Sequence, residues 1–167
     1  RNYFGLMMVN TGEADAMVTG YSRSYPTTIK PVMQLIDKAP GVSKIATTNL
    51  MMTSRGPIFL SDTAINPNPS AEELARIALM TAKTVRMFGM EPVIAMVSYS
   101  NFGSSHNEGP SKISQAVAYL HENFPDLIVD GEIQTDFALN SDMLKSKFPF
   151  SKLVNKKVNT LIFPNLD

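Results

Sequence analysis

The sequence predicts an α/β protein with a mainly parallel β-sheet and helices on both of its faces. Segments of helical and of strand periodicity alternate along most of the 167 residues. Residues 93–99 form an almost continuous apolar run, as a strand buried on both faces requires. Hydrophobic residues make up 44% and charged residues 18% of the chain, which is an ordinary mixture for a domain that buries a core.

Helices are predicted where apolar residues recur at helical spacing: residues 2–12, 26–37, 71–89, 111–124 and 135–147. Gly12 is suited to end the first helix. Pro31 falls near the first turn of the second helix, where a missing donor is tolerated. The third helix has the clearest start, because Ser70 and Glu73 form a capping box.

Strands are predicted at residues 14–19, 43–52, 58–62, 93–99, 127–129 and 158–163. The turn sequence at 54–57 joins the second and third of them in a hairpin or meander. We see no internal repeat, and we expect residues 1–167 to form a single α/β domain. Because the chain starts at Arg1 and stops at Asp167, directly after an apolar run, we also expect it to be part of a longer protein.

The composition argues against several functional classes. Fifteen basic residues balance fifteen acidic ones, so charge gives no support to a nucleic-acid or membrane-surface partner. The absence of cysteine excludes a disulfide scaffold, a thiolate metal site and a cysteine nucleophile. His106 and His121 lack metal-ligand spacing. No apolar run approaches the ~20 residues that cross a bilayer, and a cytoplasmic protein is the default expectation.

Ligands of parallel sheets bind outside the carboxyl ends of the strands, so the loops 20–28, 62–70, 98–111 and 130–136 are the candidates, with whatever follows residue 167. Loop 98–107 follows the most apolar strand and offers hydroxyl, amide and backbone N–H groups. These groups suit a phosphate or a phosphopantetheine chain, although the loop can equally be a plain connector. The candidate ligands there are Ser98, Ser100, Asn101, Gly103, Ser104 and Ser105. No dinucleotide fingerprint or P-loop is present.

Loop 21–28 is a second candidate. Arg23 can clamp a phosphate or a carboxylate, and threonines at the helix start can donate hydrogen bonds to it. The residues concerned are Arg23, Ser24, Tyr25, Thr27 and Thr28. The residues alone favour the plainer interpretation, a capped helix with a solvated arginine.

Carboxylates also follow the predicted strands, at Asp62, Asp130, Glu132 and Asp136. Paired carboxylates can act as acid and base. They also anchor loops by accepting hydrogen bonds from backbone N–H groups. No histidine or lysine is evidently paired with them, so the sequence favours the anchoring role.

These loops, in this order, resemble the phosphate acetyltransferase (phosphotransacetylase) family. The resemblance covers nearly the whole chain, through the segments 2–20 (NYFGLMMVNTGEADAMVTG), 27–36 (TTIKPVMQLI), 61–69 (SDTAINPNP), 95–100 (AMVSYS), 130–136 (DGEIQTD) and 161–164 (LIFP). It implies one lobe, the second, of a two-lobed fold similar to isocitrate and isopropylmalate dehydrogenases. The catalytic Ser-Arg pair and aspartate of the family lie beyond residue 167, so no residue here inherits a catalytic role.

Two departures narrow the resemblance. Residues 21–26 (YSRSYP) replace a His/Thr-rich segment, and residues 101–105 (NFGSS) replace Thr-x-Gly-Ser-Ala. With 137–140 (FALN) and 147–152 (KFPFSK), they resemble the C-terminal phosphotransacetylase-like domain of bacterial NADP-dependent malic enzymes.

The narrower resemblance implies a regulatory domain. It would bind acetyl-CoA or a related CoA ester and self-associate as a dimer or larger, while absent N-terminal domains oxidise malate with NADP and a divalent metal, Mg²⁺ or Mn²⁺. The fragment itself would hold no cofactor. The alternative is a true phosphate acetyltransferase that moves an acetyl group between CoA and phosphate, and a third possibility is a structural assembly domain without a ligand.

Overall fold

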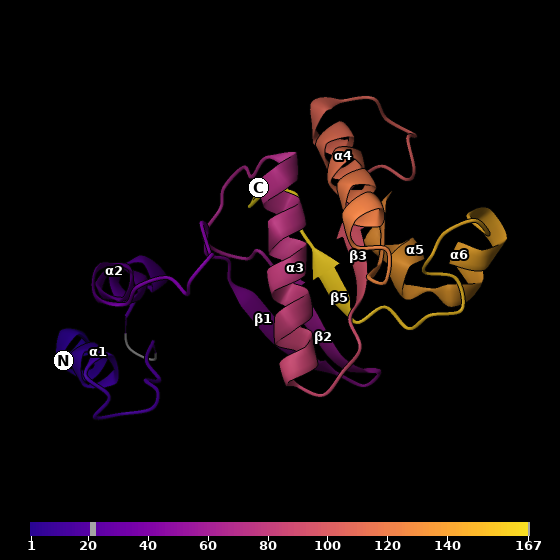
Figure 1. Cartoon of the computed structure of the whole chain (residues 1–167). Coiled ribbons are helices and arrows are strands. Elements are labelled where there is room, and N and C mark those ends of the chain that lie inside the picture. Colours follow the sequence, from indigo (N-terminus) through magenta and orange to yellow (C-terminus); the bar gives the residue numbers. More distant parts are fainter. Residues whose placement is uncertain (21–22, 167) are drawn as a thin grey trace. The chain divides into compact units, whose positions relative to one another are not determined.

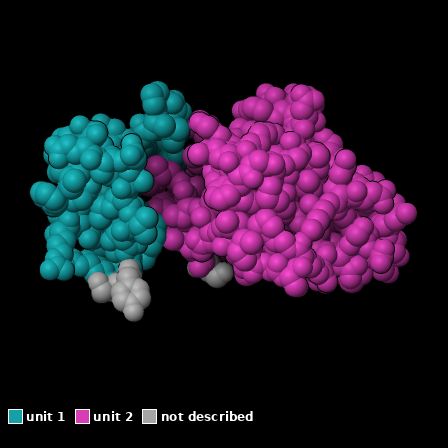
Figure 2. Space-filling model, turned by 90° about the horizontal axis from the view of Figure 1, so that it is seen from below, with its two compact units in different colours: residues 1–44 teal, residues 45–167 magenta. Residues whose placement is uncertain are grey.

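The computed structural model of the chain describes residues 1–20 and 23–166. It divides into two compact units, residues 1–44 and residues 45–167, which are coloured separately in Figure 2. The expectation that residues 1–167 form a single domain therefore stays a prediction.

The first unit contains two helices, α1 (Asn2–Asn10) and α2 (Tyr25–Leu35), as predicted. Gly12 takes a φ of +78° directly after α1, and its N–H donates to the carbonyl of Val9. The hydroxyl of Tyr3 donates to Gln34 Oε1 at 2.5 Å and links the two helices.

The predicted strand at residues 14–19 is wrong. These residues form irregular chain, and the side chain of Val18 is 99% exposed. A strand needs a neighbouring strand for its backbone groups, and no strand of the described chain pairs with this segment. The apolar composition of residues 14–19 is therefore not enough to predict a strand.

The second unit is built on a five-stranded sheet with the order β1-β2-β5-β3-β4 (Figure 1). The strands are β1 (Thr48–Thr53), β2 (Gly56–Ser61), β3 (Val93–Val97), β4 (Ile128–Ile133) and β5 (Thr160–Ile162). β1 and β2 form the predicted hairpin, and every other pair is parallel. The protein is thus an α/β protein with a mainly parallel sheet, and its shortest strand, β5, lies at the centre.

Helices cover both faces of this sheet, as predicted (Figure 1). α3 (Ala71–Met87) and α4 (Glu108–Asn123) pack on one face, where they bury Ile94 and Met96 of β3. α5 (Thr135–Leu139) and α6 (Ser141–Lys147) pack on the other, against Ala95 and Val97. The alternation along β3 is the two-residue period of a strand, and each large side chain buried in this way contributes about 1.5–3 kcal/mol.

β4 and the helix predicted at residues 135–147 both differ from the prediction. β4 continues through residues 130–133, which were expected to be loop. Gly131 makes this possible with a φ of +145°, beside an irregularity in the register between Met96 and Val97. The helix predicted at 135–147 is two helices, because Asn140 ends α5 and its side chain accepts from the N–H of Met143 to begin α6.

The capping box of α3 is present as predicted, with Ser70 and Glu73 each accepting from the other's N–H. α4 begins three residues before its predicted start, at Glu108. Pro110 is compatible with this start, because the first turn of a helix has no partners for its N–H groups. No helix of the described residues is long and apolar enough to cross a membrane.

Candidate functional site

The carboxyl ends of the parallel strands form one edge of the sheet, which we call the carboxyl edge. α3 and α4 both begin there, at the top of Figure 1. A cavity of about 250 Å³ opens between the start of α4 and the ends of β3 and β5, and we call it the carboxyl-edge cavity. Its lining residues are Asn68, Ser98, Tyr99, Glu108, Gly109, Pro110, Lys112, Ile113, Pro164 and Asn165.

The carboxyl-edge cavity favours an anion. Lys112 lines it, and its Nζ donates to Asn68 Oδ1 at 2.5 Å. The N-terminal end of α4 adds the positive end of a helix dipole. Glu108 also lines the cavity and offsets part of this charge. At the rim, hydrogen bonds with Ser105 and Asn107 lower the pKa of the Tyr99 hydroxyl.

The predicted anion loop at residues 98–105 is folded on itself. The N–H of Ser105 donates to Ser100 Oγ, and the N–H of Asn101 donates to Ser104 Oγ, both at 3.0 Å. The N–H of Gly103 donates to Glu132 Oε1 at 2.6 Å. These donors are already satisfied, so the loop resembles a rigid platform more than an open cradle. Of its six predicted ligands, Ser98 is the one that lines the carboxyl-edge cavity.

Glu132 fixes loop 98–105 through hydrogen bonds to its buried carboxylate. Its side chain is 1% exposed and accepts hydrogen bonds from Gly103, from Ser100 Oγ at 3.0 Å and from the hydroxyl of Ser114. Burial raises the pKa of this carboxyl, but the hydrogen bonds outweigh it and the pKa lies below its ordinary value. Glu132 is therefore a buried carboxylate that fixes a loop, as the anchoring interpretation expects.

Asp62 is a second buried carboxylate that fixes a loop, at the end of β2. Its Oδ1 accepts from the N–H and the hydroxyl of Thr47, at 2.9 and 2.5 Å, and its Oδ2 accepts from the N–H and the side-chain amide of Asn66, at 2.7 and 2.6 Å. Burial raises the pKa of Asp62, and these bonds lower it further than burial raises it. The carboxylate shapes the loop that carries Asn68.

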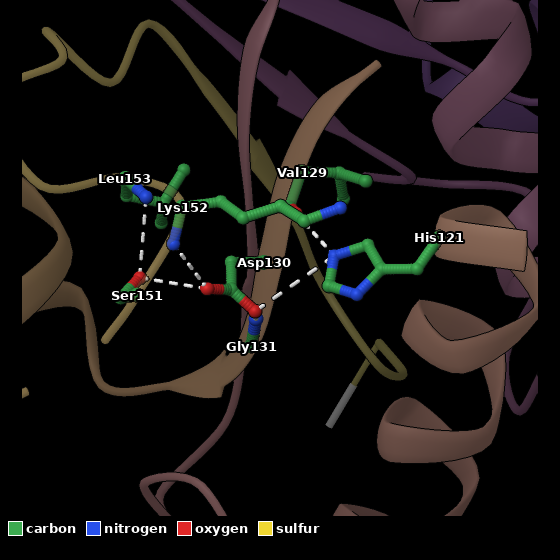
Figure 3. A network of polar contacts seen from close by, with 7 residues as sticks. All are labelled: His121, Val129, Asp130, Gly131, Ser151, Lys152 and Leu153. Carbon is green, nitrogen blue, oxygen red and sulfur yellow. Dashed lines mark hydrogen bonds and ion pairs between the residues drawn. The ribbon is translucent and has the colours of Figure 1, made fainter. Parts of the chain in front are cut away.

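Asp130 was expected in a loop and lies inside β4 (Figure 3). Its Oδ2 accepts from the hydroxyl of Ser151 and the N–H of Lys152, both at 2.8 Å. His121 Nε2 lies 4.0 Å from Asp130 Oδ1 and 2.8 Å from the carbonyl of Val129. The sequence did not reveal this pairing, because it arises only when α4 packs on β4.

Asp130, His121 and Ser151 contain the residue types of a catalytic triad without its geometry. The Ser151 hydroxyl donates to Asp130 and not to the imidazole, and Ser151 is buried. In a working triad the base contacts the nucleophile directly. The network in Figure 3 thus anchors the segment after α6.

The candidates of loop 21–28 belong to the first unit. Ser24 Oγ lies 2.9 Å from Thr27 Oγ1, and the hydroxyl of Thr28 donates to the carbonyl of Ser24. The side chain of Arg23 is exposed and has no partner among the described residues. Tyr21 and Ser22, which begin this loop, lie outside the described residues.

Lys112 and Asn68 were missed as candidate ligands. The loop of Asn68 was among those expected at the carboxyl edge, but Lys112 looked like an ordinary helix residue. The two are 44 residues apart in sequence, so only the fold brings them together. Within the described chain, no group of three His, Cys, Asp or Glu residues is placed to hold a metal ion.

Comparisons with known proteins identify the family of the chain. The model of the family described as phosphate acetyl/butaryl transferase matches residues 1–167. The chain is 40% identical to a phosphate acetyltransferase of Synechocystis sp., covering 99% of this chain and 24% of that protein. It is also 40% identical to an NADP-dependent malic enzyme of Escherichia coli, covering 98% of this chain and 21% of that protein.

Among solved structures, a phosphotransacetylase from Streptococcus pyogenes superposes with a TM-score of 0.86 at 38% identity, covering 99% of this chain and 50% of that one. The chain thus spans about a fifth to a half of the length of these relatives. The family match over every residue and the structural likeness lead to the same assignment. The chain belongs to the phosphate acetyl/butaryl transferase family.

Proposed function

We propose that this phosphotransacetylase-like domain binds acetyl-CoA or a related CoA ester, and that it serves an NADP-dependent malic enzyme as a regulatory and oligomerisation domain. Malate would be oxidised to pyruvate by other domains, which would hold NADP and a divalent metal, Mg²⁺ or Mn²⁺. The observation that carries the binding is the carboxyl-edge cavity, where Lys112, the Ser98 hydroxyl and the start of α4 converge. These are groups that bind the phosphates of a CoA ester.

Two buried carboxylates near the cavity do not supply a base for acetyl transfer. Acetyl transfer needs a base that takes the proton of the CoA thiol. Asp62 and Glu132 have lowered pKa values and several donors each, so both are poor bases. Neither is therefore a candidate for that base, which the resemblance to the acetyltransferases places beyond residue 167.

An aromatic cluster supports the malic-enzyme relationship. The segments 101–105, 137–140 and 147–152, on which that resemblance depends, each contribute to it. Phe102 lies 5.0 Å from both Phe148 and Phe150, and Phe137 lies 5.2 Å from Phe148 (ring centroids). Three of the four segments that resemble a malic enzyme therefore contribute to one packed aromatic cluster next to loop 98–105.

A phosphate acetyltransferase is the alternative. Relatives of both names match at 40% identity, and the phosphotransacetylase from S. pyogenes shares the fold. In that case a cationic side chain would help neutralise the phosphate, either Arg23 in its own loop or Lys112 at the carboxyl edge.

The test is an acetyl-CoA titration of malate oxidation by the full-length protein. We expect the rate to change with acetyl-CoA, and the half-effective concentration to rise about tenfold or more in Lys112→Gln, because a charge-assisted hydrogen bond is lost. Lys83→Gln, an exposed lysine of α3 outside the cavity, is the matched control and should respond like the parent. Arg23→Ala tests the second loop in the same assay.

Two outcomes would overturn the proposal. Formation of acetyl phosphate at rates typical of an enzyme would establish the acetyltransferase instead. No effect of acetyl-CoA on malate oxidation, with no acetyl phosphate formed, would leave a purely structural domain.

A further inference from the structure

A second hollow lies at the opposite edge of the sheet, where β2 and β5 begin. We call it the amino-edge pocket. It has a volume of about 470 Å³ and shares no residue with the carboxyl-edge cavity. Its walls come from the β1–β2 turn, the α5–α6 junction and the segment before β5, and they comprise Arg55, Pro57, Ile58, Ala138, Leu139, Ser141, Asn155, Lys156, Lys157 and Val158. Small-molecule sites have similar volumes, about 300–1,000 Å³.

The charged residues of the amino-edge pocket are all cationic. They are Arg55, Lys156 and Lys157, and no acidic residue lines the pocket. Arg55 Nη1 donates to the carbonyl of Leu139 at 3.2 Å, which fixes the guanidinium across the pocket. The side chains of Lys156 and Lys157 make no hydrogen bond or ion pair within the described part of the chain. Like charges gathered without counter-charges repel one another, and a bound polyanion would relieve that repulsion.

The rest of the lining is mostly apolar. One part of the apolar wall comes from Pro57 and Ile58 of β2 and from Val158. The other part comes from Ala138 and Leu139 of α5. Ala138 and Val158 are buried in the core of this face, so the apolar wall is a fixed part of the fold. A pocket with an apolar wall and a cationic rim selects a ligand that is apolar at one end and anionic at the other.

We propose that the amino-edge pocket binds a small organic phosphate ester with more than one negative charge. Its phosphates contact Arg55, Lys156 and Lys157, and its organic part packs on Ile58, Leu139 and Val158. The site is separate from the one proposed for the CoA ester, and either can exist without the other.

Isothermal titration of the chain with ATP tests the proposal, since ATP combines phosphates with an apolar base. We expect saturable binding that weakens about tenfold or more in the double variant Lys156→Gln/Lys157→Gln. The double variant Lys145→Gln/Lys152→Gln removes two exposed lysines outside the pocket and should bind like the parent. Lys112→Gln should also bind ATP like the parent, because it alters only the other edge.

Titrations with tripolyphosphate and with adenosine test the phosphate contacts and the apolar contacts separately. Each should bind at least about tenfold more weakly than ATP, because each lacks one kind of contact. Tripolyphosphate that bound as tightly as ATP would overturn the organic part of the proposal. Absence of saturable ATP binding would overturn it entirely, as would an equal loss in the control pair or in Lys112→Gln.

Discussion

In the second unit, charged side chains at the two edges of the sheet differ in burial and in hydrogen bonding. At the carboxyl edge, Asp62 and Glu132 are buried and each accepts several short hydrogen bonds. At the amino edge, Lys156 and Lys157 are exposed, and their side chains have no partner among the described residues. Charges of the first kind hold the fold together. Those of the second kind contribute little to the fold and remain able to contact a ligand.

The largest effect is expected at Gly131, beneath the carboxyl edge. A Cβ at this residue would lie 2.5 Å from the carbonyl oxygen of Met96, and the φ of +145° is strained for any other residue. Gly131→Ala should lower the free energy of unfolding by about 3 kcal/mol or more. Urea denaturation measures this. Gly103→Ala is the control, because its φ of +87° carries strain but its Cβ meets nothing within 4 Å, and about 1–2 kcal/mol is expected. Equal losses of unfolding free energy in the two variants would contradict the predicted clash with the carbonyl oxygen of Met96.

Removal of the Glu132 carboxylate should have the next largest effect. Glu132→Ala leaves the N–H of Gly103 and the hydroxyls of Ser100 and Ser114 without their acceptor. The expected loss is about 3 kcal/mol in the free energy of unfolding. Glu122→Ala, on the exposed side of α4, should cost no more than about 0.5 kcal/mol. If the two variants lost the same amount, the platform below loop 98–105 would not depend on Glu132.

The same carboxylates predict a dependence of stability on pH. Asp62 and Glu132 have pKa values below the ordinary 3.8 and 4.5. Their contribution is therefore fully present above those ordinary values and is lost as the pH falls through the lowered ones. The urea midpoint should therefore begin to fall only as the pH drops to about 4.5, and should continue to fall below 3.8. Asp62→Asn should show a shallower fall than the parent, and an unchanged slope would mean that Asp62 is not held as a carboxylate.

The smallest effect is expected at the amino edge. Lys156→Gln/Lys157→Gln should change the free energy of unfolding by no more than about 0.5 kcal/mol, with any gain in stability largest at low salt. Urea denaturation at two salt concentrations measures it. A clear loss of stability would show that these lysines support the fold, and the contrast between the two edges would then fail.

Much of the fold was predictable because its signals are local. The capping box at Ser70, the apolar run of β3 and the turn before Gly56 act within a few residues, and each element formed. The strand prediction for residues 14–19 failed because a strand depends on a pairing partner that composition does not reveal. β4 was predicted too short because Asp130-Gly131-Glu132 reads as a turn, whereas tertiary hydrogen bonds make both carboxylates acceptable inside a strand.

The candidate site was predictable only in outline. The rule that ligands bind at the carboxyl ends of parallel strands pointed to an edge that has a cavity, and Ser98 lines that cavity. The rule could not identify Lys112, since its pairing with Asn68 is a product of the tertiary structure. It also could not show that the Ser100 hydroxyl and the Gly103 N–H are already used, because their acceptor Glu132 lies about 30 residues further along the chain.

The position of β5 has a consequence for the order of folding. β1 and β2 can pair as soon as they are made, and so can β3 and β4, but only Thr160–Ile162 joins these halves, through Phe59 on one side and Ile94 on the other. Closing the sheet therefore waits for a contact across about 100 residues, which makes folding slower than local pairing would. During synthesis on the ribosome, we therefore expect the sheet to stay open between β2 and β3 until these three residues emerge.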